Sequence, residues 1–597
     1  MCGITGIMYE QLGSTENIER MTKTLEHRGP DTTQFMQDGA IQLGHTRLAI
    51  IDVKDGQQPM QRTVRDETYT MVYNGELYNT DELRRYLVEQ GYQFTTRSDT
   101  EVLLYAFIHW GFECVARLNG IFAFAVYKHR EKKLYIARDR FGVKPLFYSY
   151  NGGVFLFASE IKALLAHPLC EPIVNKEGLA LLLTIGPSRV PGKTVYERIL
   201  ELPPGHYLSL HNEKLTIDRY YSIESKTHED DLQTTIDKVE YLVTKAIQKQ
   251  LVSDVPVCTF LSGGIDSSII SKVASEIMPK PLHTYSLEFL NNEDYFKQND
   301  FQVSTDTPFV KQMVEAISSE HHVITLQEEQ LFNALQHSLN AKDYPSMADI
   351  DSSLYLFCEK IAKQFRVALS GECADELFGG YPWFAKESVN FPWIQSINER
   401  DELLKPNMRD TLNITKTLDE IYNKAIEPVS NESKHHQLLY LNQMYFMQTL
   451  LERKDRMSMA HGLEVRVPFA DHELVEYVWH IPHEMKRTGG VEKGLLRHAF
   501  DRHLPKDVLW RKKNPFPKTH NPFYTELVQQ ELQSRYNDSQ SILKVLFDQE
   551  AFTQLIKSGG ASFKKPWFGQ LMTGPQLLAY FIQLDDWFKQ YRIQLVL

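Results

Sequence analysis

The chain has 597 residues, of which 42% are hydrophobic and 24% charged, and its formal net charge at pH 7 is -12. This length predicts a few domains, and the composition is typical of a packed globular protein. The acidic balance lacks the basic footprint of nucleic-acid binding, and no apolar run approaches the ~20 residues that span a bilayer. The first residues have no basic region followed by an apolar stretch, so we expect no secretory signal.

Six cysteines are present and no two have C-x-x-C spacing, so neither a zinc knuckle nor a disulfide framework is expected. Free thiols are typical of a reducing compartment, which favours a cytoplasmic location. One cysteine is the second residue, in "MCGITGI". If Met1 is removed, Cys2 carries a thiol and a free α-amine, a nucleophile with a base on the same residue. The alternative is a thiol without a role at a fraying chain end.

The first third of the chain is predicted to consist mainly of strands and turns. Residues 71–79, 121–139 and 145–160 are rich in β-branched and aromatic side chains, which favour strands. Helices are predicted over 17–28 and 100–111. A mostly antiparallel β structure with a few helices is therefore expected here.

After a polar stretch at 222–231, which we expect to be a linker, strands and helices alternate. The helix predicted over 232–251 places its apolar side chains on one face. The segments that follow are predicted strands at 255–262, 282–289, 321–326 and 365–371, and predicted helices at 266–278 and 307–320. Such alternation predicts a doubly wound parallel sheet with helices on both faces. The remainder, from about 380 to 597, is predicted to be mainly helical.

The loop "FLSGGIDSS" (260–268) joins a predicted strand to a predicted helix. Its glycines let backbone amides approach a ligand, its serines add hydroxyl donors, and a helix N-terminus favours an anion. The Walker A spacing is absent, and Asp266 would repel a bare phosphate unless it held Mg²⁺. A phosphate cradle is the favoured interpretation, and an ordinary glycine turn is the alternative.

The stretch "SGGIDSS" resembles the pyrophosphate-binding loop of the ATP-pyrophosphatase family, whose members cleave ATP between the α- and β-phosphates and adenylate a carboxylate. Three further stretches resemble those of the glutamine-dependent (class II) asparagine synthetases: "LSGECADELFGGY" (369–381), "GLEVRVPFADHEL" (462–474) and "VEKGLLRHAF" (491–500). The resemblance implies that Glu372 is the general base toward ammonia and that Lys493 contacts the phosphates. Asp266 and Asp375 would hold Mg²⁺. The implied ATP-binding residues are Leu261, Ser262, Gly263, Gly264, Asp266, Ser267, Ser268, Leu287, Ser370 and Gly371.

The same family carries an N-terminal glutaminase domain of the N-terminal-nucleophile type. Its motifs occur here in order as "MCGITGI" (1–7), "HRGPD" (27–31), "GHTRLAIID" (44–52), "NGELYN" (74–79), "SDTE" (98–101), "ARDRFGVKPLFY" (137–148) and "FASEIKALL" (157–165). The resemblance therefore covers most of the chain. It implies an αββα Ntn-hydrolase sandwich over 2–220 and an ATP-pyrophosphatase domain with a helical C-terminal extension over 232–597.

By this resemblance Cys2 attacks the side-chain amide of glutamine. The Asn74 side chain and the Gly75 N–H would form the oxyanion hole that stabilises the tetrahedral intermediate. Arg47 would bind the α-carboxylate of glutamine and Asp99 its α-ammonium group, with Glu76 nearby. A zwitterionic substrate calls for a fixed cation and a fixed anion.

These parts imply a carbon–nitrogen ligase of asparagine biosynthesis. Aspartate, ATP and glutamine would give asparagine, AMP, pyrophosphate and glutamate, with ATP and Mg²⁺ as cofactors. The ammonia would pass through an internal passage between the two sites. We expect small-molecule substrates and no nucleic-acid or membrane partner, and a homodimer is one option for the oligomeric state.

The acceptor is where the sequence departs from the resemblance. Family members carry a stretch with threonine and arginine that helps to hold aspartate, whereas residues 343–357 contain Asp349 and Asp351 and no arginine. Carboxylates that face the acceptor would suit one with an extra amino group, so amidation of another carboxylate, such as diaminopimelate of cell-wall precursors, is the alternative. Acids that face solvent or cap a helix are equally expected. A β-lactam-type synthetase and a storage protein are less favoured.

Overall fold

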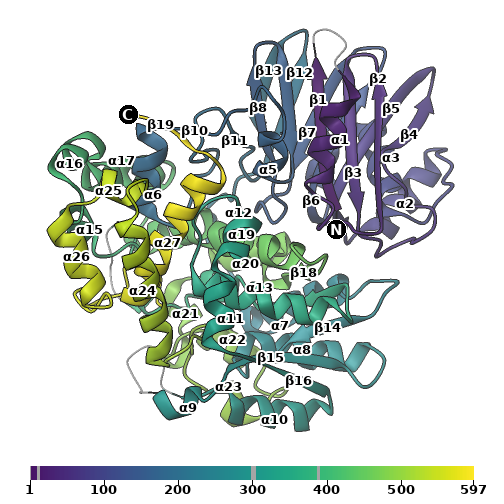
Figure 1. The fold of residues 1–597 in the computed structure, drawn as a ribbon. Helices are drawn as coiled ribbons and strands as arrows, with labels where there is room; N and C mark the ends of the chain where they lie inside the picture. The colour runs from purple at the N-terminus through teal and green to yellow at the C-terminus, as the bar shows by residue number, and fades with distance from the viewer. Residues whose placement is uncertain (1, 10–13, 297–303, 386–389) are drawn as a thin grey trace.

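The computed structural model describes residues 2–9, 14–296, 304–385 and 390–597. The N-terminal strands form two six-stranded antiparallel sheets, at the upper right of Figure 1. The first sheet contains, in spatial order, β11 (Leu200–Glu201), β8 (Phe147–Asn151), β9 (Val154–Ala158), β1 (Cys2–Tyr9), β3 (Ile41–Arg47) and β2 (Thr32–Asp38). The second contains β13 (Lys214–Arg219), β12 (His206–His211), β7 (Lys133–Arg138), β6 (Gly120–Lys128), β5 (Glu67–Leu77) and β4 (Met60–Val64).

The two sheets pack face to face between two helical layers. Apolar side chains of both sheets, among them Ile4, Val72 and Phe157, are fully buried in one cluster. Helices α1 (Thr15–Lys23) and α5 (Ile161–Leu165) lie on the first sheet, and α3 (Asp99–Trp110), with α2 (Thr80–Glu89) beside it, lies on the second. This αββα order confirms the predicted N-terminal fold. Residues 222–231, the expected linker, contain neither helix nor strand.

A parallel five-stranded sheet forms the centre of the C-terminal part (Figure 1). Its order is β16 (Glu320–Leu326), β15 (His283–Phe289), β14 (Val257–Phe260), β17 (Val367–Leu369) and β18 (Glu464–Arg466). Helices α7 (Leu232–Gln250), α8 (Ile265–Ile277) and α10 (Thr307–Ile317) share one apolar cluster with the sheet, and α13 (Asp349–Ala362) belongs to the cluster on its other face. The predicted doubly wound sheet is thereby confirmed.

The strand order reverses at β14, because later strands lie on both sides of it. The serine- and glycine-containing loop leaves the carboxyl end of β14, where open α/β sheets bind their ligands. Strand β18 was not predicted, because three residues are too few to show a period of two.

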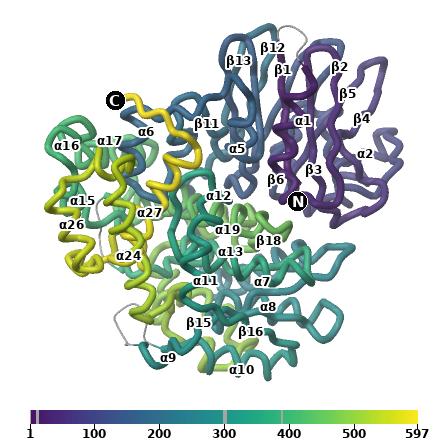
Figure 2. Tube along the Cα trace, in the orientation of Figure 1, coloured from purple at the N-terminus to yellow at the C-terminus, as the bar shows by residue number. Residues whose placement is uncertain are grey.

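The last eighty residues, which contain no recognisable motif, join the helical extension to earlier segments. They include α24 (Pro522–Asn537) and α27 (Gly574–Gln590), which pack together. The end of the chain adds β19 (Gln594–Val596) in parallel to β10 (Ile173–Asn175), both labelled beside the C-terminus in Figure 1. In the trace of Figure 2 the yellow C-terminal end lies near α6 (Lys176–Ile185), the helix that follows β10. The Trp587 indole donates to the Tyr196 hydroxyl at 2.9 Å. The C-terminal end therefore holds segments of both halves together.

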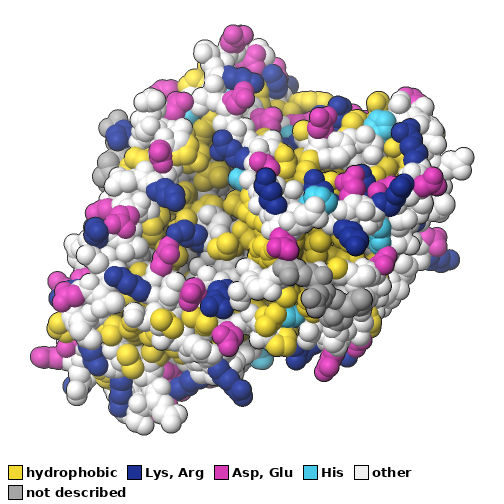
Figure 3. Space-filling model, turned by 90° about the horizontal axis from the view of Figure 1, so that it is seen from above, with side chains coloured by type: hydrophobic (Ala, Val, Ile, Leu, Met, Phe, Trp, Pro, Cys, Tyr) yellow, Lys and Arg dark blue, Asp and Glu magenta, His cyan; other side chains and the backbone are white. Residues whose placement is uncertain are grey.

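The outer surface carries charges of both signs. Figure 3 shows basic and acidic side chains interspersed over the face that it draws, with hydrophobic side chains gathered in a hollow near its middle. None of the helices in the described part of the chain has both the length and the apolar character that a bilayer crossing requires.

Candidate active sites

The first candidate site lies where β1 begins beside the end of β3. Pairing of these strands places Cys2 opposite Arg47. The Cys2 backbone nitrogen donates to Asn74 Oδ1 at 3.0 Å, and Arg28 Nε donates to the Cys2 carbonyl at 3.0 Å. Burial raises the pKa of the Cys2 thiol, so a base is needed to generate the thiolate. The nucleophile is thus held by backbone contacts on both sides.

The expected oxyanion hole lies next to Cys2 on β5. Asn74 is fully buried, and its Nδ2 has no hydrogen-bond partner among the described residues. A buried donor without a partner costs about 1–3 kcal/mol, which a ligand oxygen would recover. At Gly75 a Cβ atom would lie 2.2 Å from the Ile121 carbonyl oxygen and 2.6 Å from the Tyr73 ring, so only glycine fits.

The two charged side chains expected to bind glutamine are each fixed by hydrogen bonds. Arg47 donates from Nη1 to the Val53 carbonyl at 2.8 Å and from Nη2 to the Asp52 carbonyl at 2.7 Å. Asp99 begins α3, and its Oδ2 accepts from the Tyr73 hydroxyl at 3.0 Å and the Leu77 N–H at 3.2 Å. Burial raises the pKa of Asp99, so an arriving ammonium group would favour its ionised form.

Glu76 reaches the C-terminal half of the chain. Its Oε2 lies 3.2 Å from Nη2 of Arg466. The Nε of the same arginine lies 2.5 Å from Glu464 Oε1 on β18. Burial and the Asp99 carboxylate raise the pKa of Glu76. The first site therefore lies at an interface between the N-terminal and C-terminal halves of the chain.

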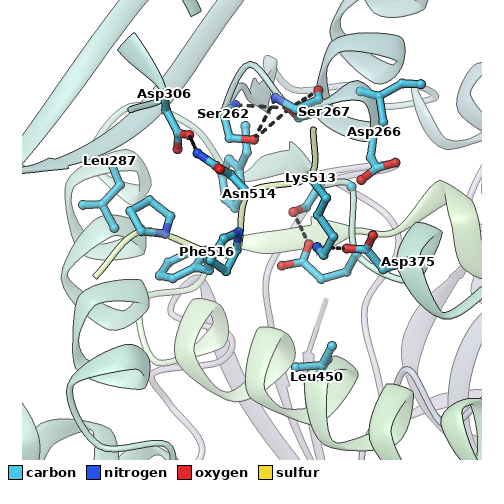
Figure 4. Close-up of a pocket in the computed structure, with 18 of the residues that line it drawn as sticks. Ser262, Asp266, Ser267, Leu287, Asp306, Asp375, Leu450, Lys513, Asn514 and Phe516 are labelled. Carbon is cyan, nitrogen blue, oxygen red and sulfur yellow. Dashed lines mark hydrogen bonds and ion pairs between the residues drawn. The ribbon is translucent and has the colours of Figure 1, made fainter. Parts of the chain in front are cut away.

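The second candidate site is a cavity of about 250 Å³ at the carboxyl ends of the parallel strands (Figure 4). Its lining includes most of the residues predicted for ATP and metal, together with both predicted catalytic residues of the synthetase half: Leu261, Ser262, Gly264, Asp266, Ser267, Leu287, Ser370, Gly371, Glu372, Asp375 and Lys493. Two of the residues predicted to bind ATP lie outside this lining. Gly263 forms the turn with a φ of +67°, and Ser268 is fully buried in α8.

Hydrogen bonds between two serines hold the loop before α8 in place. Ser267 Oγ accepts from the Ser262 N–H at 3.1 Å and lies 3.1 Å from the Ser262 hydroxyl, as Figure 4 shows. A Cβ atom at Gly263 would lie 2.7 Å from Cβ of Phe309. The positive φ and this close approach both require glycine, so the turn presents backbone and hydroxyl groups to the cavity.

Two carboxylates and two lysines face each other across the cavity. Lys493 Nζ lies 2.5 Å from Asp266 Oδ2 and 2.5 Å from Asp375 Oδ1, and Lys513 Nζ lies 2.5 Å from Asp375 Oδ2. Burial alone would raise the pKa of Asp375, but the two lysines lower it to about 2. Burial and the Asp375 carboxylate raise the pKa of Asp266. Asp266 Oδ1 is buried without a hydrogen bond in the described structure, and such an oxygen suits Mg²⁺.

Glu372 is kept ionised at the cavity wall. Lys454 Nζ lies 2.6 Å from its Oε1, and the Ser370 hydroxyl donates to its Oε2. These contacts lower the pKa of Glu372 although burial would raise it. A carboxylate that is ionised at neutral pH can accept a proton from an amine.

Several cations of this cavity were missed at the level of sequence. Arg453, Lys454, Arg511 and Lys513 line it. The basic run "RKK" at 511–513 was a signal that could have been used. Arg511 donates to the Ser262 carbonyl at 3.2 Å and pairs with Asp306 at 2.5 Å, so it supports the 262–267 loop.

Helix α19 (Met447–Met459) runs between the two sites and buries five consecutive charged residues, 452–456. Lys454 contacts Glu372 in the second site. The next residue, Asp455, accepts from Arg28 Nη1 at 2.8 Å, and Arg28 holds the Cys2 carbonyl. Neighbouring positions on one helix thus contact both candidate sites.

Asp455→Asn is expected to destabilise the protein, because it leaves the buried cations Arg28 and Lys144 with less compensation. Lys144 Nζ lies 3.6 Å from Asp455 Oδ1 and has no hydrogen bond in the described part of the chain. Breaking a buried ion pair costs about 3–5 kcal/mol. Thermal unfolding is the measurement, with Glu420→Gln as control, since Glu420 pairs with Lys416 on the exposed surface. Equal shifts in the two variants would contradict the interpretation.

Asp349 and Asp351 of the acceptor segment do not face solvent, and neither is among the residues that line the cavity. Asp351 accepts from Arg453 Nε at 2.7 Å and from the Met347 N–H at 2.9 Å. Asp349 accepts from Gln576 at 3.2 Å. The expected repulsion of an acidic acceptor is therefore absent, because Arg453, from a distant part of the sequence, neutralises Asp351.

Asp349→Asn is expected to stabilise the protein at pH 7.5 and to have little effect near pH 4. Burial raises the pKa of Asp349 to about 6, so its folded form binds a proton that the unfolded chain releases near pH 4. The free energy of unfolding that the ionised Asp349 costs therefore grows as the pH rises from about 4 to about 6, and above pH 6 this loss reaches about 3 kcal/mol. Melting temperatures of both proteins at the two pH values test this, and an equal difference at both pH values would contradict it.

Fold and sites together define a class of enzyme with a buried N-terminal thiol and a separate, cation-lined cavity on one chain. The asparagine synthase family matches residues 238–589, and the glutamine amidotransferase domain matches residues 1–221. Glutamine-hydrolyzing asparagine synthetase 3 of Bacillus subtilis (strain 168) is 47% identical over 100% of both chains. Asparagine synthetase 1 of the same organism is 30% identical over 92% of this chain and 93% of the relative. The chain belongs to the asparagine synthase family.

Proposed function

We propose that this protein is a ligase that makes asparagine from aspartate and ATP, with glutamine as the nitrogen donor. The observation that carries the proposal is the presence on one chain of the Cys2–Asn74–Gly75 site and the cation-rich cavity beside the 262–267 loop. Relatives that match the full length are described as glutamine-hydrolyzing asparagine synthetases. The products would be asparagine, AMP, pyrophosphate and glutamate.

In the first site, Met1 is removed and the Cys2 amine takes the proton of the thiol. The sulfur attacks the amide carbon of glutamine, and Asn74 Nδ2 with the Gly75 N–H stabilise the oxyanion. The C–N bond then breaks, ammonia leaves with the proton, and water hydrolyses the thioester to glutamate. Arg47 and Asp99 hold the two charged ends of the substrate. Asn74 Nδ2, which is buried without a hydrogen-bond partner in the described part of the chain, supports this assignment.

In the second site, an oxygen of the aspartate side chain attacks the α-phosphorus of ATP, and pyrophosphate leaves. The 262–267 loop and Lys493 hold the phosphates, and Ser370, Gly371, Leu261 and Leu287 surround the nucleotide. Asp266 and Asp375 would hold Mg²⁺, which shields phosphate charge when bound. Ammonia then attacks the adenylate, Glu372 takes the proton, and AMP leaves.

Aspartate is favoured over an acceptor with an extra amino group. The cavity is lined by Arg453, Lys454 and Lys493, and the nearby Asp351 is already neutralised. Neither Asp349 nor Asp351 lines the cavity, so the carboxylates that would have attracted an added ammonium group do not face the acceptor. Diaminopimelate-type acceptors are thus less suited.

Ammonia is expected to pass inside the protein, because α19 contacts the surroundings of both Cys2 and Glu372. We place the reaction in the cytoplasm, and the six free cysteines support this. A homodimer remains one option for the assembly.

Pyrophosphate release with different acceptors tests the proposed substrate. Glutamine and ATP are supplied with either aspartate or diaminopimelate. We expect release with aspartate and asparagine as the product. Release with diaminopimelate and none with aspartate would overturn the choice of acceptor, and ADP with phosphate would overturn adenylation.

A further inference from the structure

Two histidines and a glutamate share one face of the parallel sheet at its β16 edge. The register of β15 and β16 pairs His283 with Glu320 and Tyr285 with His322. Side chains alternate between faces along a strand, so His283, Glu320 and His322 project on the same side. His321, between them, hydrogen-bonds Thr284 and Ser286 instead.

The three potential ligand atoms form a nearly regular triangle. His283 Nδ1 lies 3.2 Å from His322 Nε2 and 3.7 Å from Glu320 Oε1, and His322 Nε2 lies 3.5 Å from that oxygen. A point equidistant from three such atoms lies about 2.0 Å from each, which equals the Zn–N and Zn–O bond lengths of protein sites. The described residues contain no other such group of three.

Aromatic neighbours orient both imidazole rings. The Tyr285 ring stacks on His322 with centroids 4.7 Å apart, and the Phe365 ring lies 5.1 Å from that of His283. The planes of the two imidazole rings are within 11° of parallel, and the ring centroids lie 5.5 Å apart. The cluster is therefore arranged before any ion binds, which lowers the entropic cost of binding.

A hydrogen bond between the two imidazoles accounts for the 3.2 Å contact alone. If one imidazole is protonated, an ion pair with the Glu320 carboxylate accounts for the other two distances, and the metal titration below separates this alternative from a bound cation. A cation between the three atoms accounts for all three distances.

We propose that His283, Glu320 and His322 form a binding site for a divalent transition-metal ion of the zinc class. Two imidazoles and one carboxylate suit such an ion, and a fourth position would be taken by water. The histidine side chains are 32% and 31% exposed, so the ion can exchange with solvent.

This site is separate from both candidate active sites. His283 and Glu320 begin their strands, whereas the cavity lies at the carboxyl ends, and none of the three residues lines it. A bound ion would link the edge strand β16 to β15. Toward its carboxyl end, β15 carries Leu287, which lines the cavity. The site is thus a structural clamp, and it does not depend on the proposed reaction.

Cobalt titration of the full-length protein tests the site. The metal-free protein is titrated with Co²⁺ in excess Mg²⁺, which occupies oxygen-rich sites, while visible absorption and bound metal are measured. We expect one equivalent with a tetrahedral spectrum in the starting protein, and loss of that equivalent in His322→Ala and His283→Ala. Glu320→Gln is expected to weaken binding at least tenfold. Absence of the equivalent in the starting protein, or its persistence in His322→Ala, would overturn the proposal.

His435→Ala is the matched control, because His435 and His483 also lie with their rings 3.5 Å apart but without the third ligand. This variant should keep the cobalt equivalent. Melting in metal-free buffer checks that each variant folds. Zn²⁺ should raise the melting temperature of the starting protein by several degrees and leave that of His322→Ala unchanged. An equal rise in both proteins would contradict the assignment.

Discussion

Replacing Cys2 by alanine is expected to abolish asparagine formation from glutamine while asparagine formation from added ammonium continues. The thiol is the only nucleophile proposed for the amide, so glutamine-dependent turnover should fall by at least about 10³-fold. The second cavity uses none of the residues around Cys2, so ammonia-dependent turnover should change less than about twofold. Both rates are measured as asparagine formed per minute and per mole of enzyme.

Cys114→Ala serves as the control for this experiment, because Cys114 is also a buried thiol of the N-terminal half. It should keep both activities. A chain that retains Met1 has the Cys2 thiol without the free amine, so it should behave like Cys2→Ala. Loss of the ammonia-dependent activity together with the glutamine-dependent activity in Cys2→Ala would contradict the separation of the two sites.

Glu372→Gln is expected to remove the synthetase reaction with either nitrogen source and to leave glutamine hydrolysis measurable. The carboxamide keeps the size of the side chain but cannot accept a proton from the attacking amine. Loss of a general base costs about 10²–10⁴-fold in rate. It also leaves Lys454 without its partner carboxylate at 2.6 Å, which should lower stability.

Glutamate release and pyrophosphate release from the same Glu372→Gln preparation separate these effects. If glutamate is still released and pyrophosphate formation survives while asparagine is lost, the residue acts after adenylation, as proposed. A variant that forms asparagine from ammonium at an unchanged rate would contradict the role of Glu372 as the base.

Features whose residues lie close together along the chain were predictable from the sequence. Strand, glycine turn and helix follow one another around Ser262, and the alternation from residue 232 onward predicted the parallel sheet. The three-residue strand β18 shows no period of its own, and it forms because β17 offers it an edge. Its position was therefore beyond sequence reasoning.

Contacts between distant segments could not be read in the same way. Arg453 neutralises Asp351 across 102 positions, and this reverses the electrostatic argument made for the acceptor from residues 343–357 alone. Likewise, a helix with five consecutive charges would be expected at the surface, yet α19 is buried because each charge finds a partner on another element. Such partners are set by the fold and not by spacing.

The most direct test of the central claim is the fate of the glutamine amide nitrogen. The protein is supplied with aspartate, ATP and glutamine labelled with ¹⁵N at the amide, and asparagine, AMP and pyrophosphate are quantified by mass spectrometry. We predict ¹⁵N-labelled asparagine in equal amounts with AMP and pyrophosphate. Label that appears only as free ammonium, or ATP consumption that gives ADP and phosphate, would contradict the proposal that the two sites act in sequence on one chain.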